Sequence, residues 1–548
     1  MFWILFAIGF ILRSYQFGSQ ILWCDEWHAV FNIRDFHFWS NATSYRESDN
    51  CAPLTAFYQI LTHTTGLNEF GMRLPLFLAG LFIIIFCYWF VKKVFDKNTA
   101  LIFTALIAIS PLLIHYSRYA RPYSIVSLLT FVAVAGFYAW IKTGNNFYAR
   151  VYVAAAVIAP YFHLYSLPAV VAPWCVSFCL SLYGNKEQMP ASSLKVPSMG
   201  RLLKMGMLVV LGIGVWFIPM LRSLGHVTNL VQKDHIVANT LPNMLCLFSG
   251  TSNYFITSIM IILFIYGMVC LYRMIPFLCS TIMTILLLQC ILILVTMPAV
   301  ISVGIVLARY SISLLLFWLL AIAVALNSIS SRLSYLKTRK TMILSLPFIS
   351  IIALIFILFL KGPIPAAYYS PNNFTNHHDF QYFYRNRPFQ LSDPTLSTLR
   401  FYNSLKPQRS VHTIVEYPAF SPQCMYGWEF NPYHTYQKIH GKKVIMGETH
   451  ESCAGLVAKG IRLNYLIDIT DKNSWIKRAQ YLVVHKNILN EIMTLRRDSH
   501  LSINNQRFFT PDYYSKMAGT LLELKNIYGQ PVYEDEYISV FKSNPAQE

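Results

Sequence analysis

Apolar stretches of about 20 residues, separated by short polar connections, follow one another through the first two thirds of the chain. A transmembrane helix needs roughly 20 consecutive apolar residues to cross the hydrocarbon core of a bilayer. The pattern therefore predicts a polytopic α-helical membrane protein with about eleven transmembrane helices. We expect these spans at residues 1–17, 71–91, 100–116, 122–141, 150–166, 168–184, 205–221, 252–272, 275–297, 308–327 and 342–360.

The pattern changes after residue 361. A proline-rich exit, GPIPAAYYSPNNF, leads into short β-like runs such as HTIVEYPAF and AQYLVVHK, which alternate with helix-like stretches. About 170 residues of this kind fit one α/β domain of ordinary size. The sequence thus predicts a transmembrane domain over residues 1–361 and a C-terminal extramembrane α/β domain over residues 362–548.

Composition and charge support a membrane protein. Only 13% of the residues are charged, against about 25% in soluble globular proteins. The net charge is +19, but residues 1–361 hold 24 Lys and Arg against 9 Asp and Glu, whereas the tail holds 20 and 16. The excess lies mostly in short loops of the membrane half, which is typical of the positive-inside rule and not of a nucleic-acid surface. We therefore expect a lipid bilayer and no nucleic acid as a partner.

The basic loops also orient the chain. Five of them fall on alternate connections, namely KKVFDK (92–97), Lys142 with Arg150, the segment 185–204, Arg273 and RLSYLKTRK (332–340). If these loops lie in the cytoplasm, the loop 18–70 and the C-terminal 187 residues lie on the outer side. No small-residue cleavage site follows the first apolar run, so we interpret residues 1–20 as a retained span and not as a signal peptide.

Acidic residues gather at the predicted outer surface. Of the nine in residues 1–361, six fall in the outer loop 18–70. A transporter coupled to protons or sodium usually carries acids inside its spans. The distribution therefore favours chemistry at the membrane surface, and a lipid-linked saccharide flippase or transporter remains the alternative.

The segment LWCDEWHAV places Asp25 and Glu26 directly after the first span, between Trp23 and Trp27. Aromatic neighbours suit the headgroup level of a membrane. We expect this partly dry setting to raise the pKa of Asp25 and so to strengthen it as a base. The alternative is a solvated acid that caps a helix.

Three further outer segments carry polar residues next to apolar helices. The first, DNCAPLTAFYQ (49–59), begins with Asp49. The second, SPLLIHYSRYARPYS (110–124), holds Arg118 and Arg121 in a short loop rich in tyrosine, and the third, ARYSISLLLFWLL (308–320), opens with Arg309 and Tyr310. Arginine forks match phosphate oxygens. These arginines therefore predict an anion at the outer surface, or else they extend their charged heads to lipid phosphates.

One acid and several arginines around one outer cavity suit the transfer of a sugar from a lipid-linked phosphate. The carboxylate would remove the proton of the acceptor hydroxyl, and the arginines would stabilise the departing phosphate. A metal-dependent lipid phosphotransferase is a second possibility, because Asp25, Glu26, His28 and Asp49 could share a divalent metal. A non-catalytic receptor subunit is a third.

These motifs resemble those of C-type membrane glycosyltransferases (GT-C). LWCDEWHAV resembles their W-x-D-E element, DNCAPL their D-x-x-P-P-L element, and the two arginine segments their SP…SR-x-x-R-x-Y and RY-x-x-x-x-x-P elements. The nearest groups are the protein-O-mannosyltransferase-like family (family 39) and the bacterial lipid A aminoarabinose transferases. The resemblance covers residues 1–330 and is fainter in the tail.

The resemblance implies a polyprenyl-phosphate-linked sugar as donor, inversion at the sugar and an active site on the outer, periplasmic face of a bacterial inner membrane. It implies catalytic roles for Asp25 and Glu26. It places the donor phosphate near Arg118, Arg121 and Arg309, and substrate near Asp49. We also expect substrate contacts at Tyr123, Tyr310 and His163. For His163, at the end of a span, the alternative is a satisfied core histidine. The acceptor, a glycolipid, a glycan or a protein, stays open, as do metal dependence and a pairing of Cys424 with Cys453. The segment ARYSISLLLFWLL lacks the Pro that usually follows the RY pair in this family, so whether the helix is kinked there stays open.

Overall fold

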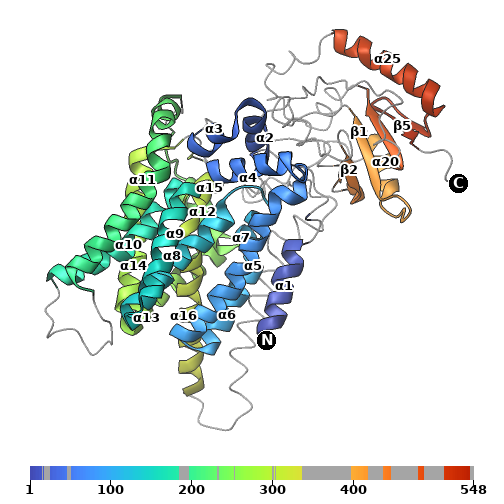
Figure 1. Cartoon of the computed structure of the whole chain (residues 1–548). Coiled ribbons are helices and arrows are strands. Elements are labelled where there is room, and N and C mark those ends of the chain that lie inside the picture. The colour runs from blue at the N-terminus through green and yellow to red at the C-terminus, as the bar shows by residue number, and fades with distance from the viewer. Residues whose placement is uncertain are drawn as a thin grey trace.

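A computed structural model of the chain combines a helix bundle with a small C-terminal sheet (Figure 1). The structure describes residues 1–14, 17, 22, 25–45, 51–183, 197–230, 234–251, 253–298, 301–302, 304–335, 397–417, 436–437, 439–445, 479–486 and 511–543.

Among the described residues, seven helical segments are long and apolar enough to cross a membrane. They correspond to α5 (Glu69–Val94), α8 (Tyr123–Thr143), η1 with α10 (Leu164–Ser166 and Leu167–Tyr183), α11 (Met199–Leu230), α13 (Tyr254–Met274), α14 (Pro276–Thr296) and η2 with α16 (Ile312–Leu314 and Leu315–Tyr335). Each of the seven overlaps a span expected from the sequence. The expectation of a polytopic helical membrane protein is therefore confirmed.

Three other expected spans form shorter helices. These are α1 (Phe2–Ser14), α6 (Lys97–Ile109) and α9 (Asn146–Phe162). The third expected span is interrupted, because α6 ends at Ile109 and α7 (Pro111–Tyr116) starts with Pro111, whose ring removes a helix hydrogen bond. The expected span 342–360 lies outside the described residues, so the number eleven stays a prediction.

Short helices cover one end of the bundle. They are α2 (Glu26–Asp35), α3 (Phe38–Thr43), α4 (Ala52–His63), α12 (Thr240–Ser249) and α15 (Gly304–Tyr310). Pro53 stands in the first turn of α4, where a missing N–H costs nothing. The side chain of Asn41 donates to Gln59 Oε1 at 2.9 Å and so ties α3 to α4.

The C-terminal part contains a mixed five-stranded sheet. Its strands are β1 (Thr413–Tyr417), β2 (Lys443–Ile445), β3 (Tyr481–His485), β4 (Tyr533–Glu534) and β5 (Ile538–Lys542), in the order β2-β1-β3-β5-β4. The first three are parallel, and β5 pairs antiparallel with both β3 and β4. The helices α20 (Ser397–Leu405) and α25 (Pro511–Tyr528) accompany the sheet. The boundary expected at residue 361 lies outside the described residues.

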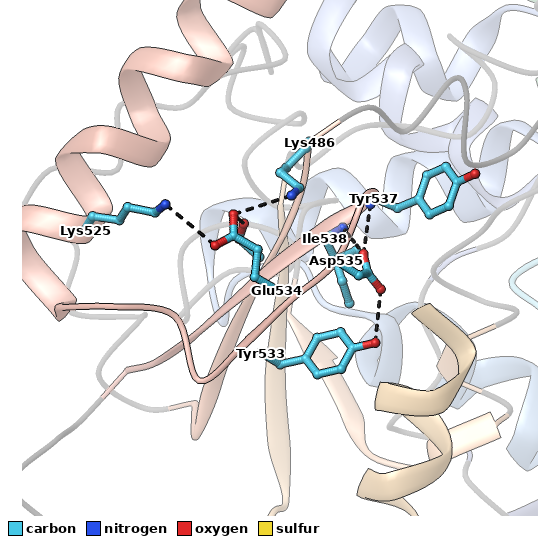
Figure 2. Close-up of polar contacts among 8 residues, drawn as sticks. Lys486, Lys525, Tyr533, Glu534, Asp535, Tyr537 and Ile538 are labelled. Carbon is cyan, nitrogen blue, oxygen red and sulfur yellow. Dashed lines mark hydrogen bonds and ion pairs between the residues drawn. The ribbon is translucent and has the colours of Figure 1, made fainter. Parts of the chain in front are cut away.

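Polar contacts fix the hairpin of β4 and β5 (Figure 2). Asp535 Oδ1 accepts hydrogen bonds from the backbone N–H groups of Tyr537 and Ile538, both at 2.8 Å. Glu534 forms ion pairs with Lys486 after β3 and Lys525 on α25. Such partly exposed ion pairs contribute little stability, so the turn geometry and the strand pairing hold this edge.

Candidate active site

Asp25 lies directly before α2 and is almost completely buried. Arg309, at the end of α15, donates from Nη1 to Asp25 Oδ2 at 2.6 Å. A 3₁₀ turn, η2, separates α15 from α16, so the chain turns after Arg309 without a proline. The structure thus brings the start of α2, in the loop 18–70, and the segment of Arg309 to one place.

The charge state of Asp25 differs from the sequence-based expectation. Burial raises the pKa of this carboxyl, but the charges of Arg309 and Arg121, together with a hydrogen bond from His28, lower it by more. The pKa of Asp25 therefore lies well below its usual value. The expected rise was wrong because it considered a dry setting alone and not the cations that the fold places beside the carboxylate.

Glu26 binds a different arginine from Asp25. Arg73 on α5 donates to both carboxylate oxygens of Glu26, from Nε at 2.8 Å and from Nη2 at 2.7 Å. The backbone N–H of Ala120 donates to Glu26 Oε1 at 2.8 Å. All of these groups are buried. Glu26 thus ties α2 to α5 and to the short loop between Arg118 and Arg121, a role that positions other residues.

Arg118 and Arg121 flank Ala120 in this short loop. The two residues are only 3% and 8% exposed, which speaks against two arginines that merely reach lipid phosphates. Tyr116, at the end of α7, and Tyr123, at the start of α8, flank the loop, and their ring centroids lie 4.5 Å apart. Arg121 is close enough to Asp25 to lower its pKa.

Aromatic side chains surround the Asp25–Arg309 pair. The guanidinium of Arg309 lies 5.7 Å from the ring centre of Tyr310. The ring of His163 lies 5.6 Å from Tyr310 and 5.5 Å from Tyr123. Tyr165 packs on Tyr310 at 4.5 Å. The structure therefore brings together three of the four expected substrate contacts, and Asp49 lies outside the described residues.

Two members of the site were missed by the sequence analysis. Tyr165 stands inside the segment PYFHLYS, two residues after His163, and its hydroxyl lies 2.6 Å from Thr296 Oγ1. Arg73 stands near the start of a long apolar span, where a single charge could have been the signal. Within the described part of the chain, no group of three or more His, Cys, Asp or Glu could hold a metal ion.

The helix bundle contains candidate membrane spans and holds the carboxylate of Asp25 against the guanidinium of Arg309. Residues 53–159 match the family described as Dolichyl-phosphate-mannose-protein mannosyltransferase. This match covers about a fifth of the chain, so these residues are similar to that family. The expected enzyme class, a membrane glycosyltransferase that uses a polyprenyl-phosphate-linked sugar, is confirmed. The matched segment includes Arg73, Arg118 and Arg121, whereas Asp25 and Arg309 lie outside it.

Solved structures show remote similarity. ArnT from Cupriavidus metallidurans in the apo state shares 11% identity over 99% of this chain and 97% of that chain, with a TM-score of 0.44. The same protein bound to undecaprenyl phosphate shares 13% identity over 99% of this chain and 98% of that chain, with a TM-score of 0.38. The oligosaccharyltransferase of Archaeoglobus fulgidus with Zn and sulfate gives 12% identity over 89% and 68%, with a TM-score of 0.41. A comparison with curated protein sequences gives no match.

Proposed function

We propose that the protein transfers a sugar from a polyprenyl-phosphate donor to an acceptor at the outer surface of the membrane, with inversion at the anomeric carbon. The observation that carries this proposal is the 2.6 Å pair of Asp25 and Arg309, with Arg121 beside it. A carboxylate that accepts a proton and cations that stabilise a phosphate are the groups that such a transfer needs.

In the proposed reaction, Asp25 takes the proton of the acceptor hydroxyl while the acceptor oxygen forms its bond to the anomeric carbon. The bond from that carbon to the phosphate oxygen breaks in the same step, and its electron pair leaves with the polyprenyl phosphate. Attack from the side opposite to the leaving phosphate inverts the sugar. Arg118, Arg121 and Arg309 stabilise the negative charge that develops on the phosphate.

The low pKa of Asp25 supports a double role for Arg309. In the donor-free protein, Arg309 binds Asp25, which keeps the carboxylate ionised but weakly basic. A donor phosphate competes for the same guanidinium, because arginine matches carboxylate and phosphate oxygens with the same fork. Donor binding then draws Arg309 away and makes Asp25 a stronger base. The base is thus activated only when the donor is present.

The aromatic residues beside Arg309 are suited to hold the substrate. Tyr310 and Tyr165 are partly exposed, whereas His163 and Tyr123 are buried behind them. Partly exposed rings offer apolar faces to a sugar ring, and the apolar helices below them suit a polyprenyl tail. We expect the acceptor to bind on the side of the first outer loop, which contains Asp49.

The arrangement in Figure 1 supports the proposed topology. The C-terminal sheet lies at the end of the bundle where α2, α3 and α4 lie. We therefore place the site and the C-terminal domain on the same, outer side, with eleven spans of the GT-C type and a bacterial inner membrane as the setting. The acceptor is a glycolipid, a glycan or a protein.

Mass spectrometry tests this function directly. Glycolipids and glycoproteins are compared between cells that carry the gene, cells that lack it and cells with the Asp25→Asn variant. The expected result is a product heavier by one sugar residue only where Asp25 is intact. An increment of a phosphate-bearing group would indicate a phosphotransferase instead, and equal products in all three strains would contradict the proposal.

A further inference from the structure

Arg13, in the last turn of α1, has no exposed surface and lies among oxygen acceptors from three places in the fold. It donates from Nη1 to the carbonyls of Gly9 at 3.0 Å and Ala108 at 3.1 Å, and from Nη2 to the carbonyl of Ile107 at 3.1 Å. Its Nε donates to Ser117 Oγ at 3.3 Å. A buried guanidinium needs such partners, because the loss of water otherwise disfavours the charge.

The break between α6 and α7 explains why Arg13 is needed there. In a continuous helix the carbonyl of Ile107 would accept from the N–H of residue 111. Pro111 has no N–H, so this carbonyl must find another donor. Arg13 supplies that donor, and its positive charge also suits the negative end of the α6 dipole.

Arg13 also reaches the loop that carries the two arginines. Ser117, its fourth partner, directly precedes Arg118 and donates to the carbonyl of Leu113 at 2.6 Å. On α5, Gly80 faces the same spot, where an added Cβ would collide with the Ser117 hydroxyl and come within 3.4 Å of Arg13 Nε. The start of the loop is therefore held tightly between α1, α5 and α6.

The other side of the same loop is held by Glu26, which accepts from the N–H of Ala120 at 2.8 Å. Arg118 lies between these two attachments and Arg121 directly after the second. A fixed loop orients its arginines before a ligand arrives, and groups held in place by a supporting shell bind and act more precisely.

We propose that Arg13 is a positioning residue for donor binding: through Ser117 it sets the place of Arg118 and Arg121. Arg13 itself is buried and does not touch the substrate. This inference rests on the proposed function, in which those two arginines bind the phosphate of the polyprenyl donor.

Three variants test it with purified protein and an assay that varies donor and acceptor separately. Arg13→Lys keeps a cation but loses the fork that reaches four acceptors. Ser117→Ala removes only the linking hydroxyl. Gly80→Ala leaves Arg13 intact but pushes Ser117 away. A displacement of about 1 Å can cost up to 10²-fold. We therefore expect the donor KM to rise by roughly tenfold in each variant, with the acceptor KM unchanged.

The matched control is Gly136→Ala on α8, where a Cβ would crowd the backbone of α9 at 3.3 Å. It disturbs helix packing without touching the loop, so it should leave the ratio of the two KM values unchanged. The Arg13 proposal is overturned if the three variants also leave that ratio unchanged. If Arg13→Lys does not fold, the milder Ser117→Ala decides.

Direct binding of a polyprenyl phosphate separates the two levels of the proposal. If Arg118→Gln and Arg121→Gln do not weaken this binding, the proposed function of the loop fails. If those two weaken it but Ser117→Ala and Gly80→Ala do not, only the positioning role of Arg13 fails.

Discussion

The carboxylate of Asp25 and the guanidinium of Arg309 lie 2.6 Å apart, although 284 residues separate them in the sequence. This pair joins the start of α2 to the end of α15 at the candidate site. It also decides the charge state of Asp25, because the nearby cations outweigh the effect of burial on its pKa. The basicity of Asp25 therefore depends on what Arg309 binds.

The first prediction concerns Asp25 itself. Asp25→Asn keeps the size of the side chain and removes the basic oxygen. General-base catalysis contributes about 10²–10⁴-fold, so we expect a loss of that order in kcat, measured at saturating donor. Asp35→Asn is the matched control, because Asp35 is the exposed last residue of the same helix. A folded Asp25→Asn protein with near-normal turnover would remove Asp25 from the mechanism.

The pH profile reports the effect of Arg309 on Asp25. A carboxyl whose pKa is lowered in the folded protein stays ionised until the pH falls below its usual value of 3.8. The acid limb of kcat/KM should therefore lie below about pH 4 in the native enzyme. Arg309→Gln removes the largest lowering charge but leaves Arg121 and the hydrogen bond from His28, so the acid limb of this variant should move to higher pH. Arg309→Lys should shift it less. Identical limbs in all three proteins would disprove the coupling.

The membrane spans could be predicted from the sequence because they depend on a local signal. Runs of apolar residues define spans, and the scarcity of acids makes Asp25 conspicuous. Arg118, Arg121 and Arg309 stand out as cations in loops that we expect on the outer side. Their convergence with Asp25 comes from tertiary contacts between distant segments, which no local pattern encodes.

Other polar contacts in the structure could not be predicted from the sequence. Glu26 reads as a partner of Asp25 in the sequence, yet it binds Arg73, 47 residues away. In the C-terminal part, Tyr402 donates to Glu416, whose Oε2 also lies 2.8 Å from His485 Nε2, and all three are fully buried. Buried polar groups need such partners, but the β-like runs reveal only the apolar neighbours of Glu416 and His485.

Donor use should depend on the two arginines of the short loop. Arg118→Gln and Arg121→Gln each remove one cation near the proposed phosphate site and keep a polar side chain. We expect each to raise the donor KM and to leave the acceptor KM unchanged, because charge-assisted hydrogen bonds to phosphate are among the strong ones. Kinetics at limiting donor are the measurement. Wild-type values in both variants would leave the arginines as structural residues only.

The topology can be tested with reporter fusions. A C-terminal fusion to alkaline phosphatase, which folds only outside the cytoplasm, should be active, and a cytoplasmic reporter at the same place should be silent. The reason is the alternation of basic loops, together with the sheet at the same end of the bundle as α2, α3 and α4 (Figure 1). The opposite pair of results would place the tail, and with it the proposed site, in the cytoplasm.

The pair of Glu26 and Arg73 should contribute strongly to stability. Both side chains are buried, with 1% and 3% of their surface exposed. Removing one partner of a buried ion pair leaves an uncompensated charge and costs about 3–5 kcal/mol, so Glu26→Ala should unfold at a clearly lower temperature in detergent. Glu26→Gln retains an acceptor oxygen for the N–H of Ala120 and should cost less. Replacing both partners by leucine removes the buried charge together with its counter-charge, so the double variant should regain much of the lost stability. Glu26→Ala protein as stable as the wild type would show that the bidentate contact does not hold α2 against α5.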